Sequence, residues 1–189
     1  MKKIIIGTLI GTIIFFAYQS AMWVGGFHKN LWSYSAEQNK ILQSMSDAHL
    51  QEALYVMPDP NPNGTMDHNK AHDEMTKYVG KPWAMVFYHP VMHGEDMGMI
   101  LKGLMHSLFA ALIAAMVIYY GAFSSFSSRF FTGWSFGLFA IVQGPMNELN
   151  WWSFPWSFVQ PQVIDLTVGW ALCSIWLAWY VKRSKSASA

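Results

Sequence analysis

Four apolar runs divide the chain, and each approaches the length of a membrane-spanning helix. A bilayer core of about 30 Å requires about 20 apolar residues in helical form. The runs cover residues 4–24, 99–120, 130–146 and 163–181. The third run is the shortest, and it ends at Gly144 and Pro145. We therefore expect an all-α membrane protein, built as a bundle of four transmembrane helices.

These runs predict a division of the chain into three parts. Residues 1–24 form the first transmembrane helix, and residues 25–98 form an extracytoplasmic segment of roughly 70 residues. Residues 99–189 hold the other three helices, short loops and a basic tail. All three parts belong to one domain, because the bundle needs the first helix.

The extracytoplasmic segment mixes helical and irregular patterns. Ser35 and Gln38 have the spacing of a capping box, and a helical stripe of apolar positions follows them. That stripe comprises Ile41, Leu42, Met45, His49, Ala53 and Leu54. A Pro-rich linker at 58–64 and a short helix at 67–79 come next. Residues 83–88 are strand-prone but have no evident partner, so we expect them to be extended.

The distribution of charge predicts the orientation. The expected cytoplasmic ends carry positive charge and no acid, because lysine and arginine flanking the spans set topology. These positive residues are Lys2, Lys3, Arg129, Lys182, Arg183 and Lys185. Both termini are therefore expected in the cytoplasm. The Met-Lys-Lys start and the basic tail favour a bacterial inner membrane.

The overall composition excludes several classes of protein. Hydrophobic residues make up 53% of the chain and charged residues 12%, whereas soluble domains carry about 25% charged residues. The formal net charge of +1 gives no reason to expect a nucleic-acid partner. The single cysteine excludes an intrachain disulfide and a Cys-based zinc site.

Polar residues gather toward the outer ends of the predicted spans. Ionisable groups within a span are costly and usually face the bundle interior. One interpretation is a polar outer-leaflet pocket, with Lys102 paired to Glu148 or Asp165. The other is that these residues cap helix ends at the headgroup level. The cluster comprises Gln19, Lys102, His106, Gln143, Asn147, Glu148 and Asp165.

A second group of residues has the chemistry of a copper site. Imidazole combined with thioether suits copper, particularly Cu(I). Methionines near these histidines are also expected by chance in a chain with thirteen Met. The candidate ligands are His68, His72, His89, Met92, His93, Met97, Met99 and His106, with Glu95 and Asp96 inside the run.

The connection between the last two predicted helices is rich in tryptophan. Trp151, Trp152 and Trp156 are expected in a loop at the outer interface. They form either a lipid-facing aromatic belt or a recognition patch for a partner.

No sequence motif assigns an enzymatic activity. Our leading hypothesis is an accessory or assembly subunit of a larger membrane complex, with lipids and other membrane subunits as partners. The alternatives are a periplasm-facing protein that handles copper, and a membrane-embedded enzyme or small-molecule binder that uses the polar pocket.

Overall fold

The computed structural model describes residues 1–59, 61, 64–65, 67–94 and 97–182. The chain forms two compact units. We call Met1–Ser33 together with Glu95–Ala189 the bundle unit, and Tyr34–Gly94 the inserted unit. Residues 25–33, expected in the extracytoplasmic segment, belong to the bundle unit.

The elements that the structure describes in the bundle unit are all helices. Its helices are α1 (Lys2–Val24), α4 (Met97–Tyr120), α5 (Phe126–Gln143), α6 (Pro145–Trp151) and α7 (Trp156–Tyr180). Within the described residues, α1, α4 and α7 are long and apolar enough to cross a membrane. The chain thus has three candidate membrane spans, as a multi-pass membrane protein would.

Helix α5 was the third expected span, and it falls outside that group. It has 18 residues, a length of about 27 Å at 1.5 Å per residue. Its sequence contains Arg129, serines and Gln143, which lower its hydropathy. The chain then breaks at Gly144, and α6 begins with Pro145 in its first turn, where a missing N–H costs nothing.

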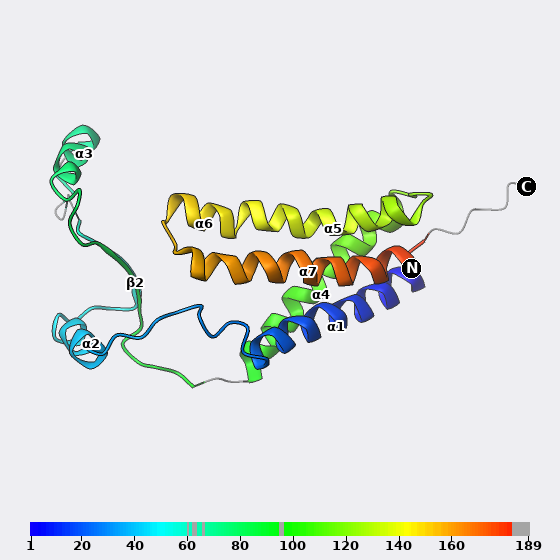
Figure 1. Cartoon of the computed structure of the whole chain (residues 1–189), viewed down its shortest axis with the longest axis horizontal. Helices are drawn as coiled ribbons and strands as arrows, with labels where there is room; N and C mark the ends of the chain where they lie inside the picture. Colours follow the sequence, from blue (N-terminus) through cyan, green and yellow to red (C-terminus); the bar gives the residue numbers. More distant parts are fainter. Residues whose placement is uncertain (60, 62–63, 66, 95–96, 183–189) are drawn as a thin grey trace, which may run out of the picture. The chain divides into compact units, whose positions relative to one another are not determined.

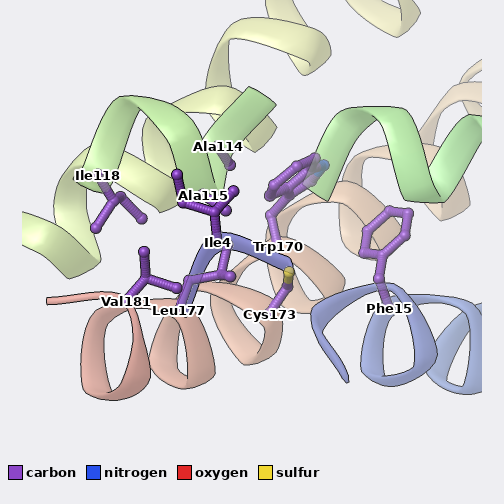
Figure 2. Close-up of a cluster of buried hydrophobic side chains, with 9 residues drawn as sticks. All are labelled: Ile4, Phe15, Ala114, Ala115, Ile118, Trp170, Cys173, Leu177 and Val181. Atoms are coloured by element: carbon purple, nitrogen blue, oxygen red, sulfur yellow. The ribbon is translucent and has the colours of Figure 1, made fainter. Parts of the chain in front are cut away.

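Helix α7 lies at the centre of the bundle unit and contacts α1, α4, α5 and α6. Helix α1 packs against both α4 and α7, and α5 runs beside α7 (Figure 1). Figure 2 shows the buried core between these helices. Its members are Ile4, Phe15, Ala114, Ala115, Ile118, Trp170, Cys173, Leu177 and Val181.

Several helix glycines lie in this internal packing. A Cβ added at Gly137 would lie 2.6 Å from the Cβ of Trp170, and one at Gly133 would lie 2.7 Å from Ser174 Oγ. Gly11 faces Cys173 of α7 in the same way. Such glycines let helix backbones approach closely, so they hold α1 and α5 against α7.

The inserted unit contains a two-stranded sheet, so the all-α expectation is wrong and the fold is mostly helical. Strand β1 (Ala53–Met57) pairs with β2 (Ala84–Tyr88) in antiparallel register, with Ala53 opposite Tyr88. The strand-prone run 83–88 therefore has a partner. The pattern had assigned Ala53 and Leu54 to the preceding helix.

That helix, α2 (Gln38–Asp47), ends early. Ala48 caps it, and His49 has a φ of 54°, a left-handed conformation that stops a helix. At its start, Ser35 Oγ accepts a hydrogen bond from the Glu37 N–H at 3.1 Å. The short helix α3 (His68–Thr76) begins after Asp67, whose side chain caps it. The Pro-rich linker lies between β1 and α3, and its residues 60, 62 and 63 are outside the described residues.

Candidate functional site

A buried hydrogen bond between two side chains joins the segment after α1 to helix α7. Gly26 has a φ of 74°, which glycine adopts without strain, and the chain turns at this point. His28 follows and is 6% exposed. Its Nε2 lies 2.9 Å from Oδ2 of Asp165, which is 7% exposed.

Aromatic rings cover this pair. The indole of Trp23 stacks on the His28 imidazole with ring centroids 4.5 Å apart, and Trp32 lies against Trp23 at 5.8 Å. Within the described residues, His28 Nδ1 and Asp165 Oδ1 are buried without a hydrogen-bond partner. Removing either member would therefore leave the other polar group buried and uncompensated.

The predicted polar cluster divides into separate local groups. Asp165 is buried, but its partner is His28; in the described residues Lys102 forms no ion pair with Glu148 or Asp165. Lys102 and His106 lie on the exposed face of α4. Of the remaining members, Gln143 is exposed, whereas Gln19, Asn147 and Glu148 are half-buried.

Residues of α6 and the adjoining helices form their own hydrogen bonds. Glu148 accepts a hydrogen bond from Gln162 Nε2 at 3.5 Å, and Asn147 Nδ2 donates to the Gln143 carbonyl at 3.1 Å. These contacts position α6 against α5 and α7. A functional polar pocket built from the whole cluster stays a prediction.

Arg129 forms another buried polar contact in the bundle unit. It is 8% exposed, and its Nε donates to the Ala178 carbonyl at 2.7 Å. One Nη donates to the carbonyls of Phe123 and Ser124 at 2.9 and 3.3 Å. A cation near the end of α7 also interacts favourably with the helix dipole. The sequence pattern identified Arg129 only as a marker of topology.

The copper-site residues lie in both units. His72, His89, Met92 and His93 are exposed in the inserted unit, and His89 Nδ1 lies 3.4 Å from Glu52 Oε1. The candidates on α4 are Met97, Met99 and His106.

No three His, Cys, Asp or Glu residues come together as a metal site in the part of the chain that the structure describes. Glu95 and Asp96 lie outside the described residues, as does the side chain of His68. The copper site stays a prediction.

The three tryptophans of the predicted loop are exposed and mostly helical. Trp151 ends α6, Trp156 begins α7, and Trp152 is the C-cap of α6. The exposed fraction is 75% for Trp151, 52% for Trp152 and 51% for Trp156. This exposure suits both a lipid-facing belt and a recognition patch.

Sequence reasoning missed His28 because it lies outside every apolar run. One signal was available: an acid inside an apolar run requires a compensating partner, and His28 follows the first run closely.

No family model, curated protein or solved structure matches the chain.

Proposed function

We propose that this protein is an accessory or assembly subunit of a larger membrane complex. The observation that supports this proposal is the exposed apolar surface of the inserted unit. In the described part of that unit, Tyr88 is the only buried residue. A unit that folds alone buries a hydrophobic core, so the exposed apolar side chains of this unit are suited to contact with a partner molecule.

Part of this apolar surface lies on one face of the sheet formed by β1 and β2, which we call the hairpin. Leu54, Val56 and Phe87 share one face of the sheet by alternation and register, and they are 46%, 47% and 65% exposed. An isolated two-stranded hairpin is marginally stable in water. Exposed apolar patches commonly mark protein–protein contacts, so this hairpin face is where we expect a protein partner.

Co-purification tests this role. The tagged chain, extracted from its native membrane in mild detergent, should migrate on a native gel well above the mass of the monomer. Replacing Leu54 and Phe87 by serine should remove the larger species. The matched control is Val79→Ser, since Val79 is 81% exposed and lies outside the sheet. Migration of the unmodified chain as a lone monomer would contradict the proposal.

We further propose that α5 is the fourth span, in a bacterial inner membrane with both termini in the cytoplasm. Helix α5 packs along α7, and its exposed residues Phe131, Leu138 and Phe139 are apolar. Lys3 Nζ donates to the Lys182 carbonyl at 2.9 Å. These two lysines and Arg129 therefore gather at one end of the bundle, which supports a cytoplasmic location for that end.

Cysteine labelling in intact cells tests this topology. Ser124 precedes α5 and Ser153 follows α6, and both are exposed. With four spans, an impermeant maleimide should label Ser153→Cys but not Ser124→Cys. The parent chain gives the background, because its only cysteine, Cys173, is buried. Labelling of both variants, or of neither, would place the two loops on one side and exclude α5 as a span.

A further inference from the structure

The exposed face of α4 differs from those of the other three long helices. The exposed stripes of α1, α5 and α7 are mainly aliphatic and aromatic, which suits lipid, with a few serines and glutamines among them. Representative members are Ile5, Leu9 and Ile13 on α1, Phe131 and Phe139 on α5, and Ile164, Leu172 and Ile175 on α7. On α4 the corresponding stripe includes Lys102 and His106 and continues through Phe109, Ile113 and Tyr120.

The position of His106 makes contact with lipid unfavourable. Lys102 and His106 lie about 8 Å and about 14 Å from Met97 along the helix axis at 1.5 Å per residue. A lysine near a helix end can extend its stem to the interface. The short imidazole of His106 cannot do so, and ionisable groups inside a span normally face protein or a polar cavity.

Among the described residues, no carboxylate is available to pair with Lys102 and His106. The described part of the bundle unit contains two acids. Asp165 pairs with His28, and Glu148 accepts a hydrogen bond from Gln162. Positions three or four residues from Lys102 and His106 hold no acid, so no pair forms along the helix itself.

We propose that this face of α4 binds a transmembrane helix of a different subunit, one that carries an aspartate or glutamate within the membrane. The inference rests on the proposed role as a subunit of a membrane complex. A carboxylate placed between Lys102 and His106 would give both side chains a polar partner in a low-dielectric environment. Such charge complementarity would also fix the register of the two helices. Phe109 and Ile113 would then pack against the same partner helix.

A protein partner fits this face better than the alternatives do. Lipid phosphates lie at the headgroup level, whereas His106 lies deeper in the span. Among the described residues of its bundle unit, a second copy of this chain would offer only Asp165, which is buried, and Glu148, which is half-buried. The flexible thioether of Met105, which is 44% exposed, is a side chain that adapts to a partner surface.

Photo-crosslinking in native membranes tests the proposal. A benzophenone amino acid at Phe109 should crosslink to one membrane protein, and mass spectrometry should locate the crosslink near an acid in a span. The matched control is the same probe at Leu172, which is 40% exposed on the apolar stripe of α7. Lys102→Glu should reduce the Phe109 crosslink by about tenfold or more, while Lys102→Arg keeps it. Lysine in place of the partner's acid should restore the crosslink to Lys102→Glu.

Several results would overturn the proposal. These are crosslinks only to lipid, crosslinks to a second copy, equal yields at Phe109 and Leu172, or a partner segment without an acid. A loss of the crosslink in a Glu95→Gln and Asp96→Asn variant would instead implicate a carboxylate of this chain. If the larger complex persists on native gels while Phe109 gives no crosslink, only the α4 contact fails. If no larger complex forms, the proposed function fails as well.

Discussion

His28 and Asp165 are separated by 137 positions in the sequence, yet Nε2 and Oδ2 lie 2.9 Å apart in a buried contact. His28 belongs to the segment that leads from α1 toward the inserted unit, and Asp165 lies on the central helix α7. The pair therefore attaches the exit of α1 to the central helix of the bundle.

Loss of one member of this pair should destabilise the bundle. His28→Ala leaves the Asp165 carboxylate buried without a partner, which should cost about 3 kcal/mol of unfolding free energy. Asp165→Ala should have a similar effect, and the double variant should lose less than the sum of the two. Unfolding by SDS in mixed micelles measures these changes.

The control for the pair is an exposed histidine. His93 is exposed in the inserted unit, so His93→Ala should leave the unfolding midpoint of the bundle unchanged. A midpoint for His28→Ala equal to that of the parent chain would show that the pair contributes nothing to stability.

The contrast between Asp165 and His28 shows what the sequence could reveal. Asp165 stands out because it interrupts an apolar run. The apolar runs also predict where α1 and α4 begin, to within two residues of their first residues in the structure. The partner of Asp165 is set by a turn at residues 25–31, which leaves no periodic signal. Lys102 also interrupts an apolar run, but it lies together with His106 on the exposed face of α4.

The hairpin shows a second limit of pattern reading. Ala53 and Leu54 continue the helical spacing of Ile41, Leu42 and Met45, so local periodicity assigned them to a helix. Their strand conformation depends on pairing with residues 84–88, and such distant pairing is invisible in a local window. Helix α7 likewise begins seven residues before its apolar run, because polar residues such as Gln160 and Gln162 interrupt its first two turns.

Arg129 should be intolerant even of lysine. Its guanidinium donates to three carbonyl oxygens at once, and the single ammonium of lysine cannot reproduce that planar geometry. We expect Arg129→Lys to lower the unfolding free energy by about 2 kcal/mol. Thermal unfolding in detergent measures the loss.

The control for Arg129 is an exposed cation at the same end of the bundle. Lys3 donates one hydrogen bond to the Lys182 carbonyl, and Lys3→Gln should change stability by less than about 1 kcal/mol. Equal effects of the two substitutions would show that the buried position of Arg129 adds nothing.

The close helix packing at glycine positions can be tested with two alanine substitutions. A methyl group at Gly137 would overlap the Trp170 side chain at 2.6 Å, so Gly137→Ala should destabilise the α5–α7 contact by about 2 kcal/mol. A methyl group at Gly103 would meet Phe16 at 3.8 Å, an ordinary contact. Gly103→Ala should therefore be neutral or slightly stabilising, since alanine favours a helix. The same stability loss at both positions would indicate that packing against Trp170 is not the cause.

Disulfide trapping can test the register of the hairpin. Leu54 lies directly opposite Phe87, and directly opposite Cβ atoms are about 5 Å apart on one face of a sheet. The variant Leu54→Cys with Phe87→Cys should therefore crosslink under mild oxidation, as shown by a shift in mobility on a non-reducing gel. Cys173 is buried in the bundle unit, so it should not compete.

A one-residue shift supplies the control for that experiment. Val86 points to the opposite face of the sheet from Phe87, because successive side chains alternate along a strand. Leu54→Cys with Val86→Cys should therefore remain reduced under conditions that oxidise the first pair. If residues 53–57 were instead a continuation of α2, neither pair would have the geometry of a disulfide, and both variants would stay reduced. Crosslinking of the control pair alone would mean that the register is shifted by one residue.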